Sequence, residues 1–165
     1  MEARKLRQSD SEPFQLSLRI RHPSVDPDEL SREFSIEAAH CFRAGDPRLS
    51  RSGIASVHPE SYWLAPLNTA NWPVEVNSPG IRRLLSSQER MGVVATRSLG
   101  WALALSTRVF TAHAQTLRRI VAEGGQVSLL ITAPAGEVNG FSLTPAVSRA
   151  FSQLGITLEF EFTGD

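Results

Sequence analysis

"FQLSLRIRH", residues 14–22, alternates between apolar and polar side chains. Successive side chains of an extended strand point to opposite faces of a sheet, so this pattern predicts a half-buried strand. A second segment of the same kind, ITLEFEF at residues 156–162, is expected to place Phe162 inward and Glu159 and Glu161 outward. Both segments predict a sheet with one face against a core and the other in water.

Three more strands are expected between these two, at residues 36–43, 61–66 and 126–133. The first should turn Phe42 inward, together with Ile36 and Ala38. The second should end at Pro66, because proline cannot donate a hydrogen bond to a neighbouring strand.

Two helix starts have a clear local signal. Asp26-Pro27 and Thr144-Pro145 each place a capping side chain directly before a proline, which is favoured in the first turn of a helix. Gly155 is expected to end the second of these helices.

Residues 97–123 carry a stripe of apolar and small residues at alternating spacings of four and three. This spacing predicts one long amphipathic helix, with Gly124-Gly125 ending it. The competing interpretation makes WALAL, residues 101–105, a strand that precedes a shorter helix capped by Ser106 or Thr107. The unbroken stripe favours the single helix.

The order of these elements predicts an α+β fold, with a single antiparallel or mixed sheet of about five strands and helices packed on one face. Residues 1–12 are expected to be a disordered polar tail, and residues 13–165 to form a single domain. Residues 67–95 are expected to be an insertion, in which Ser78-Pro79 starts a short helix.

Composition narrows the class of protein. The chain has 165 residues, 41% of them hydrophobic, a formal net charge of zero and one cysteine, Cys41. No apolar run approaches the roughly 20 residues that a membrane-spanning helix needs, and the polar N-terminal residues do not resemble a secretory signal. A lone cysteine suits a reducing compartment, so a cytoplasmic protein without membrane contact is expected. Lys5 is the only lysine, which removes phosphate-loop and Schiff-base chemistry from consideration.

Three segments in order resemble the bacterial domain of unknown function 4279 family. They are SLRIRHPSVDPDELSREFSIEAAHCFRAGDPR at residues 17–48, ESYW at 60–63 and GFSLTPAVSRAFSQLGITLEFEF at 140–162. Phe42 stands where the family pattern suggests tryptophan, and Glu161-Phe162 stands where an acid-x-tyrosine pattern is expected. The family has no assigned function, and its scale and layout are similar to those of toxin-immunity proteins, which is an analogy of fold.

No catalytic residue, metal site or cofactor is expected. Adjacent His40 and Cys41 would point to opposite sides of a strand, so they and His58 do not form an obvious metal site, and Cys41 is expected to be an ordinary buried cysteine. His113 is expected to be a hydrogen-bonded core or boundary residue. Glu159 and Glu161 are expected to be solvated strand charges.

The best anion-binding candidate is the turn at residues 43–48, where Arg43 and Arg48 flank Gly45-Asp46. Two guanidinium groups there could hold a phosphate or carboxylate over Trp63 as a floor, as in a small-molecule-binding domain or weak enzyme. The alternative, which is favoured, is structural: Asp46 caps its own turn and pairs with Arg43 or Arg48.

A non-enzymatic protein-interaction domain, immunity-like in its action, is the expected function. Aromatic and arginine side chains dominate interface energies. Nucleic acid is not expected as a partner, because the chain has no surplus positive charge. Arginines concentrate within residues 81–119, so an acidic protein is the expected partner. The candidate interaction surface consists of Trp72, Arg82, Arg83, Arg90 and Arg97.

Overall fold

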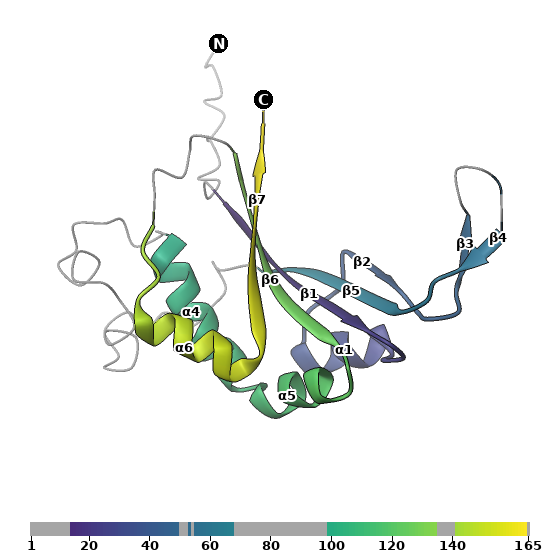
Figure 1. Ribbon diagram of the computed structural model, residues 1–165, viewed down its shortest axis with the longest axis horizontal. Coiled ribbons are helices and arrows are strands. Elements are labelled where there is room, and N and C mark those ends of the chain that lie inside the picture. The colour runs from purple at the N-terminus through teal and green to yellow at the C-terminus, as the bar shows by residue number, and fades with distance from the viewer. Residues whose placement is uncertain (1–13, 50–52, 54, 68–98, 135–140, 165) are drawn as a thin grey trace, which may run out of the picture.

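The computed structural model describes residues 14–49, 53, 55–67, 99–134 and 141–164 (Figure 1). The expected N-terminal tail, the helix after Ser78-Pro79 and nearly all of the expected insertion lie outside these residues. So does the whole candidate interaction surface around Trp72 and its neighbouring arginines.

A five-stranded mixed sheet forms the centre of the fold, with the order β2-β5-β1-β6-β7. β1 lies antiparallel to both of its neighbours, whereas β6 and β7 are parallel. A separate hairpin, β3–β4, projects from the body of the molecule (Figure 1). The strands are β1 (Gln15–His22), β2 (His40–Phe42), β3 (Pro47–Leu49), β4 (Ala55–Val57), β5 (Ser61–Leu67), β6 (Gln126–Pro134) and β7 (Ile156–Thr163).

Four helices are described, and they lie together along one side of the sheet (Figure 1). They are α1 (Pro27–Phe34), α4 (Leu99–Thr111), α5 (Ala114–Ala122) and α6 (Pro145–Leu154). The fold is therefore α+β, with a mixed five-stranded sheet and helices on one face, as the sequence predicted. None of the described helices is long and apolar enough to cross a membrane.

The local cap signals are also confirmed. Asp26 caps α1 by accepting from the N–H of Asp28 at 2.9 Å, and Thr144 caps α6 by accepting from the N–H of Val147 at 3.3 Å. Gly155 ends α6 with φ at 71°, in the left-handed region that glycine adopts without a Cβ clash.

The prediction of one helix over residues 97–123 is wrong, because α4 and α5 are separated at Ala112 and His113. The N–H groups of these two residues bond three residues back, which tightens the last turn of α4. The Thr111 hydroxyl donates to the carbonyl of Thr107 at 2.6 Å, a bond that tends to bend a helix. The alternative that made residues 101–105 a strand is wrong as well, since they lie inside α4.

The strand expected at residues 36–43 is shortened to β2. Ser35 adopts a left-handed conformation with φ at 53°, and Ile36 donates its N–H to the carbonyl of Ser31, so the chain after α1 is held in a helix-ending turn. Phe42 was expected inward, but it pairs with Tyr62 on the outer face of the sheet.

Pro66 does not end β5, which continues to Leu67 and places Pro66 opposite Ser17 of β1. The shorter strand β2 pairs only with residues 62–64 on the other side of β5. Proline is tolerated at position 66 because β2 does not extend along this part of β5, so no described strand needs the missing N–H.

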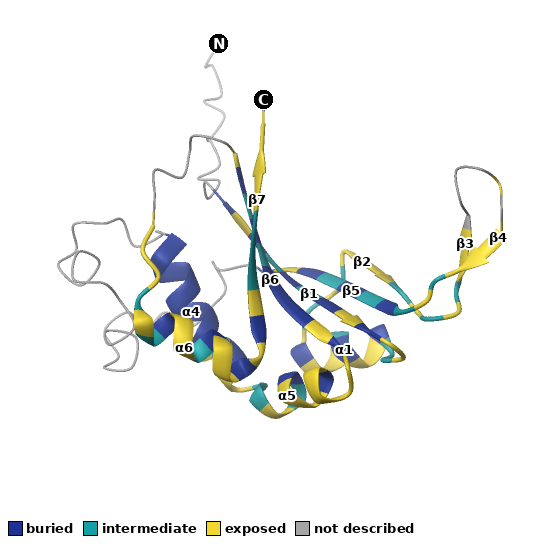
Figure 2. Ribbon diagram, viewed as in Figure 1, coloured by how far each residue is buried: buried dark blue, intermediate teal, exposed yellow. Residues whose placement is uncertain are grey.

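The core lies between the inner face of the sheet and the helices, whose buried sides face it (Figure 2). Phe162 departs from the expected inward pattern, because 61% of its surface is exposed near the end of β7. Fully buried side chains of the core include Leu18, Ile20, Trp63, Leu129, Leu30, Phe110, Leu117 and Ile120.

Candidate functional site

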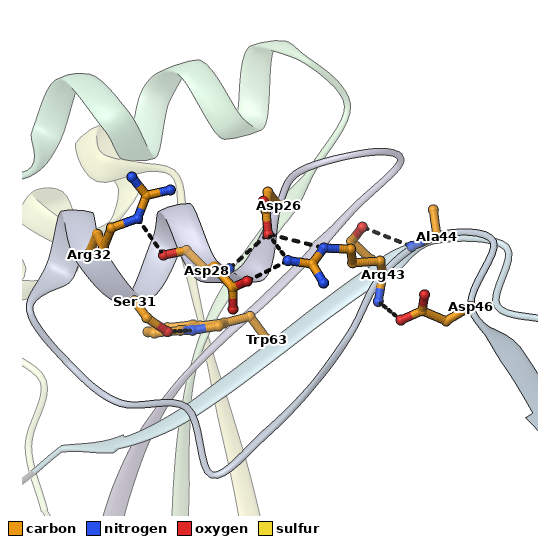
Figure 3. Close-up of polar contacts among 9 residues, drawn as sticks. Asp26, Asp28, Ser31, Arg32, Arg43, Ala44, Asp46 and Trp63 are labelled. Atoms are coloured by element: carbon orange, nitrogen blue, oxygen red, sulfur yellow. Dashed lines mark hydrogen bonds and ion pairs between the residues drawn. The ribbon is translucent and has the colours of Figure 1, made fainter.

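The turn after β2 is held by its own polar groups. The Asp46 carboxylate accepts from the backbone N–H of Arg43 at 2.7 Å (Figure 3). Gly45 donates its N–H to the carbonyl of His58 at 2.8 Å, and its φ of 87° is one that glycine adopts readily. Asp46 therefore acts as a turn cap, as the structural interpretation of the sequence expected, although it binds the backbone rather than the guanidinium of Arg43.

The Arg43 guanidinium extends to the N-terminus of α1 (Figure 3). It donates to the Asp26 carboxylate through Nη2 at 2.8 Å and Nε at 3.2 Å, and it also donates to Asp28. The backbone N–H of Asp28, and after it Arg43, hold the pKa of Asp26 below its ordinary value. The two carboxylates in turn raise the pKa of Arg43. The positive charge of Arg43 is thus matched by two acids of its own chain.

Trp63 is part of the core and does not form a floor beside this turn. None of its surface is exposed, and its indole N–H donates to the Ser31 hydroxyl at 2.9 Å. Its ring lies 5.7 Å from that of Phe34. Arg48 is exposed on β3. Of the four residues proposed for anion binding, the structure thus brings Arg43 and Asp46 into direct contact and leaves Trp63 enclosed.

The cysteine and histidine candidates from the sequence do not assemble into a reactive or metal-binding site among the described residues. Cys41 was expected to be buried, but it is exposed on β2. It lies opposite Trp63 of β5 in the strand pairing, while His40 points to the other face of the sheet. His113 packs against Phe34 at 5.0 Å, with its Nδ1 3.7 Å from the Glu33 carboxylate. Within the described part of the chain, no three His, Cys, Asp or Glu side chains gather as a metal site would require.

Glu33 itself joins α1 to α5. It accepts from the Thr116 hydroxyl at 2.7 Å, and this bond, followed by the nearby His113 imidazole, lowers the pKa of Glu33. His22 is buried at the end of β1, where its Nδ1 accepts from the backbone N–H groups of Ser24 at 3.1 Å and Val25 at 2.9 Å. Both sets of contacts join secondary-structure elements or close a turn, so we assign them structural roles.

A cluster that the sequence pattern does not reveal lies on the outer face of the sheet. We call His40, Phe42, His58 and Tyr62 the aromatic ladder. The Phe42 ring stacks on His58 at 3.7 Å and on Tyr62 at 5.2 Å, and His40 meets both Phe42 and Tyr62 edge-on at 5.8 Å and 5.7 Å. Three segments supply these rings, namely β2, β5 and the residue that follows β4. The only sequence signal was the aromatic character of residues 60–63, because the rest depends on strand register.

Ion pairs border the aromatic ladder along the outer face. Arg21, directly opposite Tyr62, donates to the Glu60 carboxylate, with its Nε at 2.7 Å. Farther across the sheet, Arg19 donates to Glu159 of β7. A hydrogen bond from Ser128, and then Arg19, lower the pKa of Glu159, so this carboxylate is held in its charged form.

No protein-family model matches the chain, and no curated protein or solved structure is significantly similar to it. We therefore infer its function from the geometry of the chain itself.

Proposed function

We propose that this protein is a non-enzymatic interaction domain that binds a partner protein through the aromatic ladder on the outer face of its sheet. One observation carries the proposal. The described helices all lie on the inner side of the sheet (Figure 1), while four ring side chains contact one another, stacked or edge-on, on the outer side.

Preordered rings favour binding for two reasons. Aromatic side chains contribute a large share of the energy at protein interfaces, usually from a small central cluster. Rings already fixed by their neighbours also lose less side-chain freedom when a partner docks. Phe42 and Tyr62 are only half-buried, so part of each ring is still accessible to a partner.

The charges beside the ladder suit the rim of an interface. The Arg21–Glu60 and Arg19–Glu159 pairs are partly exposed, and each joins two residues of this chain. Rim pairs of this kind contribute to orientation and association rate more than to affinity. An acidic partner remains part of the proposal, and its support is the concentration of arginine within residues 81–119.

The competing proposal of an anion site at the turn has weaker support. An incoming phosphate would have to displace the two carboxylates that already bind Arg43. Because Trp63 is enclosed, the ligand would also lack the aromatic floor that the sequence suggested. Binding a protein through the aromatic ladder requires neither the displacement of these carboxylates nor an exposed Trp63.

We also propose a cytoplasmic location and a relationship to the domain of unknown function 4279 family, with an immunity-like role. An exposed, unpaired Cys41 supports a reducing compartment. The order of the three quoted segments supports the family relationship.

The test is a pull-down from the host with wild-type protein and a Phe42→Ala/Tyr62→Ala variant. Val121→Ala is the matched control, because Val121 is also an exposed apolar residue, at 40%, but belongs to α5. We expect wild type and the control to recover the same partner and the ladder variant to lose it. Circular dichroism verifies that both variants are folded. Equal recovery by all three folded proteins would contradict the proposal.

A further inference from the structure

We infer that the free edge of β7 binds an extended segment of a partner protein as an additional strand, and that this segment alternates basic and apolar residues. The inference concerns the edge opposite β2 and does not depend on the aromatic ladder. Among the described strands, β7 has a neighbour on one side only, namely β6. No described strand pairs with its outer edge, whose backbone groups a further strand can therefore pair with.

The two edges of the sheet differ in length. The β2 edge is three residues long, whereas β7 has eight residues and pairs with β6 without interruption from Ile156 to Thr163. β7 contains neither proline nor a bulge in this register. Prolines and bulges are two of the devices by which proteins block a long, regular edge, so their absence leaves the backbone of β7 suited to strand addition.

The inner side of β7 presents apolar surface near the end of the strand. Phe160 stacks on Phe141 at 5.1 Å, and Phe162 is 61% exposed. Leu143 and Phe141 are also among the exposed large apolar residues. This part of β7 extends past the helix layer and is exposed in Figure 2. A partner strand would cover it with apolar side chains on the same side.

The outer side of β7 is acidic. Glu159 and Glu161 stand two positions apart, and Glu159 is already held by Arg19. Glu161 is exposed and has no ion-pair partner within the described residues. A lysine or arginine at the facing position of an added strand would supply the missing charge, since opposite charges across a strand pair stabilise it.

A second copy of the chain fits this edge poorly when its β7 is centred on Phe160, which overlaps most of the strand. In a symmetric antiparallel pair centred on Phe160, with both helix layers on one side, Glu159 of each copy would face Glu161 of the other. Two facing pairs of like charges destabilise such a dimer.

The probe is a synthetic nine-residue peptide of alternating arginine and valine, titrated into ¹⁵N-labelled protein. We expect the amide signals of β7 to shift in a saturable manner. Two control peptides are required: one with glutamate in place of arginine, and one with alternate backbone nitrogens methylated, which removes the strand hydrogen bonds. Neither control should shift the β7 signals.

Variants of the protein make the test specific. Glu161→Arg should weaken peptide binding about fivefold, as expected when a favourable cross-strand charge pair becomes repulsive. Glu37→Arg, which changes an exposed acid outside β7, should leave the affinity unchanged. The Phe42→Ala/Tyr62→Ala variant should also bind the peptide normally, so a failure of the proposed function and a failure of this inference are distinguishable.

Three results would overturn the inference. The first is the absence of β7 shifts at millimolar peptide, and the second is equal binding of the methylated peptide. The third is a concentration-dependent shift of the same signals without peptide, which would identify a second copy as the occupant.

Discussion

Replacing Trp63 with phenylalanine should destabilise the protein by about 3 kcal/mol if Trp63 is a core residue. The substitution removes roughly three buried heavy atoms, worth about 2 kcal/mol at about 0.8 kcal/mol per buried methylene. It also leaves the Ser31 hydroxyl without the indole N–H that now donates to it at 2.9 Å, which costs about 1 kcal/mol more. For a domain of this size, the sum corresponds to a Tm lower by about 6–12 °C.

Urea unfolding followed by circular dichroism measures this change without depending on the tryptophan that is removed. Ser31→Ala is the matched control, because it removes the same hydrogen bond while retaining the ring. We expect Ser31→Ala to cost about 1–2 kcal/mol, clearly less than Trp63→Phe. A Trp63→Phe protein with wild-type stability would refute the core assignment. If it also lost phosphate binding, the anion-site interpretation would replace it.

Three further results are expected. Asp46→Ala should lower the free energy of unfolding by about 1 kcal/mol in urea melts, because the backbone N–H of Arg43 loses its acceptor; unchanged stability would contradict the capping role. Gly125→Ala should cost about 1–3 kcal/mol by thermal melting, because a Cβ there would lie 2.7 Å from neighbouring heavy atoms; a normal Tm would show that the packing is looser than described. The pKa values of Asp26 and Glu33 are lowered by folding, so their contribution is present above their ordinary values of 3.8 and 4.5 and is lost as the pH falls through and below them. Unfolding free energies measured from pH 6 to pH 3 should therefore decrease below about pH 5, and a flat profile would exclude these contributions.

The features that were predictable from sequence are those set by local patterns. The strands β1 and β7 follow from alternating side chains, although burial alternates clearly only in β1. The helix starts at Asp26 and Thr144 follow from caps within a few residues. The break at Ala112 and His113 was not predicted. The apolar stripe continues across α4 and α5, so in the sequence two helices cannot be distinguished from one continuous helix.

The aromatic ladder was not predictable, because it depends on strand register. Phe42 meets Tyr62 only because β2 pairs with β5 at one register, and a shift of one residue would move each side chain to the other face. His58 joins them after the β3–β4 hairpin returns the chain to the sheet. By contrast, Arg43 and Asp46 were found because they share one turn, but the carboxylates that bind the Arg43 side chain lie at least 15 positions earlier in the sequence.

Site-specific photocrosslinking in the host tests the central claim most directly. A photoreactive phenylalanine analogue in place of Tyr62 would stand within the aromatic ladder, and the same analogue in place of Val121 would stand on α5. We predict one discrete covalent adduct with a partner protein from the Tyr62 position and none from the Val121 position. An adduct from Val121 alone, or none from Tyr62 in a folded protein, would contradict binding through the outer face of the sheet.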